Sequence, residues 1–69
     1  MKMYIDIIDK FAFNVLLSGC IFLVRYNGYL NKWCVYEYSD FLQEEITISD
    51  KCVSRKDCIE CLVYFYGEQ

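Results

Sequence analysis

The chain has 69 residues, of which 57% are hydrophobic and 19% aromatic, and its formal net charge is −3. This length and composition predict one compact domain spanning residues 1–69, because the chain carries enough apolar surface to offset the entropy lost on folding. The acidic balance argues against direct binding of nucleic acid, which requires clustered Lys and Arg side chains.

The N-terminal segment, residues 2–18, has the apolar spacing of an amphipathic helix. Its apolar stripe consists of Tyr4, Ile5, Ile8, Phe11, Ala12, Val15 and Leu16. Its polar face consists of Lys2, Asp6, Asp9, Lys10 and Asn14. Gly19 is expected to end this helix, because glycine adopts the left-handed conformation that follows many helices.

Two strands are expected next, at residues 20–26 and 29–38, joined by the dipeptide Asn27-Gly28. Asn-Gly is typical of a two-residue type I′ turn, in which both central residues need positive φ. Such a turn would place Phe22 opposite Trp33. The face expected to pack against the helices then contains Phe22, Val24, Trp33 and Val35.

Residues 41–48 are predicted to form a third strand, with Ile46 and Ile48 pointing inward. The polar tripeptide at residues 49–51 is expected to form a loop. The sheet is therefore expected to have three strands.

The C-terminal segment is predicted to be a second helix. Ser54-Arg55-Lys56-Asp57 resembles a capping box, so the helix should run from residue 55 to residue 66 and end at Gly67. The expected inner stripe contains Cys58, Cys61, Leu62 and Phe65.

Together these elements predict a small α+β domain of order α-β-β-β-α, with a three-stranded antiparallel meander and two helices packed on one face. This order resembles that of double-stranded-RNA-binding domains, and Arg55-Lys56 stand where that family begins its basic second helix. The chain lacks the family's run of lysines and its Gly-Pro-x-His loop. RNA binding is therefore not expected.

Five cysteines suggest several chemistries. A structural zinc site is one alternative, and its four thiolates would be Cys34, Cys52, Cys58 and Cys61. Disulfides are not expected, because the cysteine count is odd and no secretory signal is evident. Four of the thiols are expected to be buried in the core, and Cys52, in a loop, is expected to be the exposed one.

The string Leu17-Ser18-Gly19-Cys20 resembles a bacterial lipobox, so a lipid-anchored lipoprotein is a second alternative. The preceding residues lack the positive start and uninterrupted apolar stretch of a signal peptide. No membrane-spanning segment is predicted, because the apolar run at residues 11–24 is too short. A cytoplasmic location is expected.

Enzymatic arrangements are largely excluded. The chain contains no histidine, which removes Ser-His and Cys-His nucleophile pairs, and no Gly-rich phosphate loop. It also contains no proline, which removes the cis-proline that thioredoxin-like proteins use beside a Cys-x-x-Cys such as Cys58 to Cys61. The chain is therefore predicted to be non-enzymatic and to need no cofactor.

What remains is a surface for binding another protein. The candidate contact residues are tyrosines and acids: Tyr29, Tyr36, Glu37, Tyr38, Asp40, Glu44 and Glu45. Aromatic side chains anchor interfaces and acids steer basic partners, so the expected partner is a protein with a basic or nucleic-acid-binding surface. As a compact, acidic, tyrosine-rich and proline-free chain without a catalytic site, it looks like the small inhibitors of phages and mobile elements, including anti-CRISPR and other anti-defence proteins. A symmetric homodimer is a further expectation, because it would cover an open strand edge.

Overall fold

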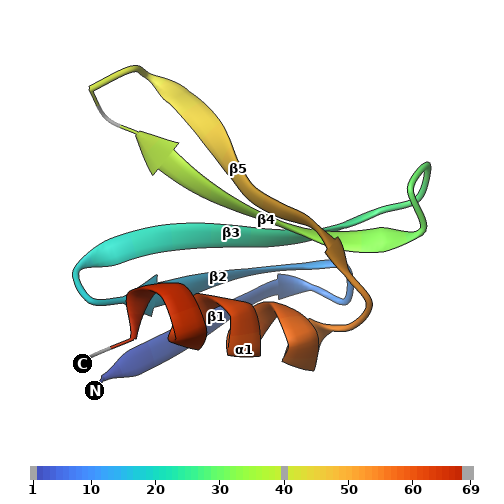
Figure 1. Ribbon diagram of the computed structural model, residues 1–69, viewed down its shortest axis with the longest axis horizontal. Coiled ribbons are helices and arrows are strands. Elements are labelled where there is room, and N and C mark those ends of the chain that lie inside the picture. The colour runs from blue at the N-terminus through green and yellow to red at the C-terminus, as the bar shows by residue number, and fades with distance from the viewer. Residues whose placement is uncertain (1, 40, 68–69) are drawn as a thin grey trace.

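The structure is a computed structural model that describes residues 2–39 and 41–67, and Figure 1 shows one antiparallel sheet with a helix against it. The elements are β1 (Met3–Asp9), β2 (Ala12–Leu17), β3 (Cys20–Asn27), β4 (Lys32–Ser39), β5 (Glu44–Cys52) and α1 (Arg55–Tyr66). Strands adjacent in the chain are adjacent in the sheet, in the order β1-β2-β3-β4-β5. The predicted α-β-β-β-α order with two helices is therefore wrong.

The segment predicted to be the first helix is a β1–β2 hairpin. Its second strand buries every other residue, Phe13, Val15 and Leu17, which is the two-residue period of a half-buried strand. The carboxylate of Asp9 accepts a hydrogen bond from the N–H of Phe11 (2.7 Å) and so stabilises the turn between the strands. Both faces of this hairpin carry apolar side chains, so the apolar residues of the two strands together imitate the spacing of an amphipathic helix.

The connection between β2 and β3 is a two-residue turn at Ser18 and Gly19. Both residues have positive φ, 54° and 77°, and Leu17 lies opposite Cys20. These are the features of a type I′ turn. Gly19 thus adopts the left-handed conformation expected of it, but it reverses a strand instead of ending a helix.

The β3–β4 connection is longer than the two-residue turn predicted at Asn27-Gly28. Asn27 pairs with Lys32 across a four-residue loop, and its side-chain oxygen accepts hydrogen bonds from the N–H groups of Tyr29 (2.9 Å) and Leu30 (3.2 Å). The positive φ falls on Asn31 (54°). The side chain of Asn27 therefore caps a four-residue loop instead of forming part of a two-residue turn.

This longer loop changes the predicted register of β3 and β4. Phe22 lies opposite Glu37 instead of Trp33, and Val24 lies opposite Val35. The shift is an even number of residues, so every side chain keeps its face. The prediction that Phe22, Val24, Trp33 and Val35 share the face that packs against a helix is confirmed.

The core lies between α1 and one face of the sheet. Its buried members are Phe13, Val15, Leu17, Phe22, Val24, Val35, Cys52, Cys58 and Leu62. The rings of Phe22 and Tyr66 pack at 4.8 Å between centroids. The Ser18 hydroxyl donates a hydrogen bond to the carbonyl oxygen of Tyr66 (2.7 Å), which ties the end of α1 to the β2–β3 turn.

The helix has the predicted bounds. The side chain of Ser54 accepts a hydrogen bond from the N–H of Asp57 (3.1 Å), and the Asp57 carboxylate accepts one from the N–H of Val53 (3.0 Å). Gly67 follows the last turn, as predicted. The prediction of the helix's inner stripe is only partly confirmed. Cys58 and Leu62 are fully buried, whereas Phe65 is 62% exposed.

The last strand begins and ends later than predicted, at Glu44–Cys52 instead of residues 41–48. Residues 49–51 belong to this strand and are not a loop, because pairing with β4 continues to Cys52 through two irregularities of register. Ile48 packs against the core as predicted, whereas Ile46 remains 40% exposed.

Candidate functional site

The side of the sheet that α1 does not cover is the candidate functional surface. Directly paired residues of antiparallel strands share a face, so strand pairing assigns each side chain to a side. We call this side the open face and define it by Tyr4, Leu16, Ile21, Leu23, Arg25, Tyr36, Tyr38 and Glu45.

The open face gathers part of the predicted contact residues. Tyr36 and Tyr38 lie on it in β4, and Glu45 lies opposite Tyr38 in β5. Glu44 begins β5 opposite Ser39, so its side chain is directed to the other side of the sheet.

The other predicted residues lie elsewhere or outside the described residues. Tyr29 is fully exposed in the β3–β4 loop, at the other end of β4 from Tyr38. Glu37 lies opposite Phe22, on the side that α1 covers. Asp40 lies outside the described residues. The sequence could not place these side chains, because that requires the register of β4.

Arg25 organises the polar part of the open face. Its guanidinium forms an ion pair with the carboxylate of Glu45 (3.0 Å) and lies over the ring of Tyr36, 4.8 Å from the centroid. Both charged side chains of the pair remain nearly half exposed. The interaction holds the Tyr36 ring and one acid in place on a surface that solvent reaches.

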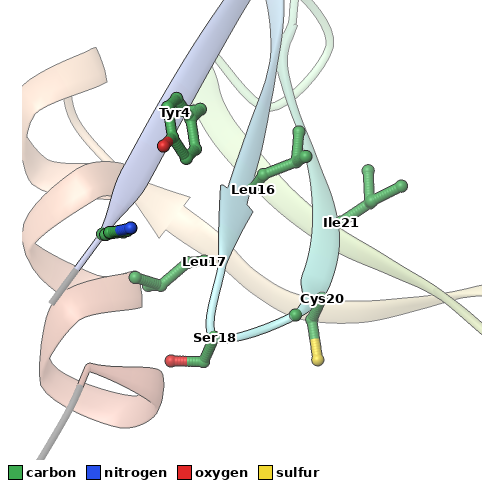
Figure 2. Close-up of a pocket in the computed structure, with 8 residues that line it drawn as sticks. Tyr4, Leu16, Leu17, Ser18, Cys20 and Ile21 are labelled. Atoms are coloured by element: carbon green, nitrogen blue, oxygen red, sulfur yellow. The ribbon is translucent and has the colours of Figure 1, made fainter.

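An apolar row on the open face was missed by the sequence reasoning. Tyr4, Leu16 and Ile21 are paired across β1, β2 and β3, and their exposed fractions are 62%, 41% and 56%. Figure 2 shows these three side chains on adjacent strands, beside a hollow of about 530 Å³ near Ser18. The alternation of residues 12–17, taken as a strand, would have placed Leu16 on the face opposite the core.

A second hollow links the apolar row to the tyrosines. It has a volume of about 200 Å³ and is lined by Asn14, Ile21, Leu23, Tyr36, Tyr38 and Glu45. The apolar row and the tyrosine–acid group are therefore parts of one surface across all five strands.

The cysteines are free thiols, and Cys52 is not where it was predicted. Cys52 is only 4% exposed and lies opposite Trp33 at the end of β5, so its predicted exposure in a loop is wrong. Burial, followed by the neighbouring Cys52, raises the pKa of the Cys58 thiol well above 9.0. Burial also raises the pKa of Cys61. Both shifts favour the protonated thiols at neutral pH, and the buried Cys58 thiol is expected to be poorly reactive.

Within residues 2–39 and 41–67, no group of three or more Cys, Asp or Glu side chains is placed to hold a metal ion. The zinc alternative at Cys34, Cys52, Cys58 and Cys61 stays a prediction, which elemental analysis of the reduced protein would test.

The helix in the described part of the chain is shorter than a membrane crossing requires. No protein-family model, curated protein or solved structure matches this chain.

Proposed function

We propose that this chain is a non-enzymatic protein-binding module that uses its open face as the contact surface. The observation that carries the proposal is the set of exposed apolar and aromatic side chains in register on adjacent strands: Tyr4, Leu16, Ile21 and Tyr38. Contiguous exposed apolar surface rimmed by polar groups is typical of protein interaction sites.

The chemistry of the open face fits a protein better than a small ligand. The hollows on this surface are open to solvent, whereas small-molecule sites usually enclose most of the ligand's surface. Tyrosine rings supply contact area at low cost in side-chain entropy, and Tyr36 is already oriented by Arg25. A partner would therefore meet a surface that needs little rearrangement.

The charges favour a basic partner. Glu45 stands at one end of the open face, Glu44 precedes it at the edge of the sheet, and the chain as a whole carries a formal charge of −3. Acids beside aromatic anchors attract basic surfaces such as those of nucleic-acid-binding proteins. We propose that the chain is an inhibitor of the kind that phages and mobile elements encode. It would act by occupying a basic surface of its target protein.

The proposal is tested by affinity capture with two matched variants. Ile21→Ser lies on the open face and Phe65→Ser on the outer side of α1, and the native side chains are similarly exposed, at 56% and 62%. The wild-type chain and Phe65→Ser should capture the same partner from a host lysate, identified by mass spectrometry, and Ile21→Ser should lose it. Equal capture by both variants would exclude the open face.

A second arm tests the charge of the partner. Reversing Glu44 and Glu45 to lysine should weaken capture of that partner and reduce its sensitivity to salt, because exposed charges act through screened attraction. Capture that is unchanged by the reversal would show that the acids do not take part.

A further inference from the structure

The two edges of the sheet differ in how well they are protected from pairing with another strand. β5 carries four charged residues (Glu44, Glu45, Asp50 and Lys51) and has two irregularities in its pairing with β4. Charges and bulges are the devices by which proteins protect edge strands. β1 carries two aspartates, Asp6 and Asp9, and one irregularity of register between Ile7 and Asp9, but it has neither lysine nor arginine. Its residues from Met3 to Ile7 pair regularly with β2 and include exposed isoleucines.

The β2–β3 turn determines which backbone groups of β1 are free. In a two-residue hairpin the flanking residues, here Leu17 and Cys20, bond to each other, and bonded pairs then alternate along the strands. The N–H of Tyr26 donates to the carbonyl oxygen of Phe11 (2.9 Å), which agrees with this alternation. Leu16 and Asn14 therefore direct their backbone groups toward β1.

The same alternation continues into β1. Leu16 lies opposite Tyr4 and Asn14 lies opposite Asp6, so these residues of β1 bond to β2. The N–H and C=O groups of the intervening residues point outward from the sheet, and these residues are Met3, Ile5 and Ile7. Their side chains also lie at the rim of the core layer, where Ile5 is 43% and Ile7 66% exposed.

We infer that β1 pairs with β1 of a second copy of this chain, antiparallel about a two-fold axis through Ile5. In this register Ile5 lies opposite Ile5 of the second copy, and Met3 lies opposite Ile7 of the second copy. All of these residues have outward-pointing backbone groups and side chains on the helix-covered side. The pairing therefore satisfies the free backbone groups and covers the apolar rim together.

The charges on the opposite side of β1 are compatible with the same register. Tyr4 lies opposite Asp6 of the second copy, and that carboxylate lies diagonal to both Lys2 and Asp6 of the first copy, so attraction and repulsion offset each other. Moving the axis to Asp6 would place two aspartates directly opposite each other, which is destabilising. The register through Ile5 is self-complementary in backbone bonding and apolar contact and avoids directly opposed aspartates.

A second copy also suits this edge better than a different strand. Pairing of β1 with itself is isologous and closes after two chains, whereas pairing of β1 with β5 of another copy would continue into a fibre. The dimer does not rest on the proposed function, since it uses the edge of β1 and leaves the open faces of both copies uncovered.

The test is the mass of the protein in solution, measured by sedimentation equilibrium over a wide concentration range. The wild type should approach twice the 8.3 kDa mass of one chain. Ile5→Lys should weaken dimerisation by about 100-fold or more, because it removes apolar contact and places two ammonium groups at the axis. Ile46→Lys is the matched control, since Ile46 is 40% exposed on the opposite edge strand, and it should remain dimeric.

Mixing Ile5→Lys with Ile5→Glu should restore a dimer of one copy of each variant, because opposite charges then meet at the axis. Circular dichroism checks that both variants are folded. If either variant is unfolded, hydrogen exchange of the backbone amides of Ile5 and Ile7 in the wild type is measured instead. This exchange should slow as protein concentration rises, because dimerisation protects these amides. A monomeric wild type, exchange that ignores concentration, or a dimer broken by Ile46→Lys and not by Ile5→Lys would overturn the inference.

Discussion

The two faces of the sheet carry similar side chains but have different environments. On the helix-covered face Val15, Phe22 and Val24 are completely buried, whereas on the open face Leu16 and Ile21 stay about half exposed. Adjacent residues of one strand thus contribute to stability on one face and to an uncovered surface on the other. The comparison shows that the apolar content of this chain exceeds what its own core uses.

The largest expected effect separates the faces by stability. Phe22→Ala should lower the free energy of unfolding by about 3–5 kcal/mol, because it leaves a cavity beneath α1. Ile21→Ala, one residue earlier and 56% exposed, should change it by only about 0.5 kcal/mol. Urea unfolding followed by circular dichroism measures both, and equal losses would contradict the assignment of the two faces.

Alkaline pH should also act through the helix-covered face. The pKa of Cys58 is raised above 9.0 by burial and by Cys52, so this thiol holds its proton more tightly in the folded chain. Its stabilising contribution is complete below pH 9 and is lost as pH rises further, by up to about 1.4 kcal/mol per pH unit. Cys58→Ala should flatten the pH dependence of unfolding, and an unchanged slope would refute this assignment.

The cap of α1 holds the cover of that face in place. Ser54→Ala removes the acceptor for the N–H of Asp57 and should cost about 1 kcal/mol in the free energy of unfolding. Ser54→Asp should retain most of the stability, because aspartate also caps helices. Thermal unfolding distinguishes the two variants, and similar losses in both would contradict the capping role.

The smallest effect is expected on the open face itself. Glu45→Gln removes the exposed ion pair with Arg25 and should lower the free energy of unfolding by about 0.5 kcal/mol or less. The loss should disappear at high salt, where exposed charges are screened. Unfolding at two salt concentrations measures it, and a loss well above 1 kcal/mol would show that the open face contributes to stability.

Local signals predicted the C-terminal helix well. Ser54, Asp57 and Gly67 define its ends through contacts within a few residues of the chain, so no knowledge of the sheet was needed. The strand at residues 20–27 and the face of Phe22 were also predictable, because alternation survives an even shift of register.

The N-terminal hairpin was not predictable in the same way. Apolar residues on both faces of β1 and β2 imitate helical spacing, and the choice between the two periods depends on pairing with β3. The turn at Ser18-Gly19 carried the deciding information, since both of its residues adopt positive φ. The open face followed from this hairpin, so its apolar row was missed with it.

The order of the strands has a consequence for synthesis of the chain. Each strand pairs with its immediate predecessor, so the sheet can assemble from local hairpins as residues emerge, which favours rapid folding. The helix α1, which covers Phe22, follows the strands in the chain. Its final turn must then contact Ser18 in the β2–β3 turn. Until then both faces of the nascent sheet expose apolar side chains, and this is the period in which the chain is most exposed to aggregation.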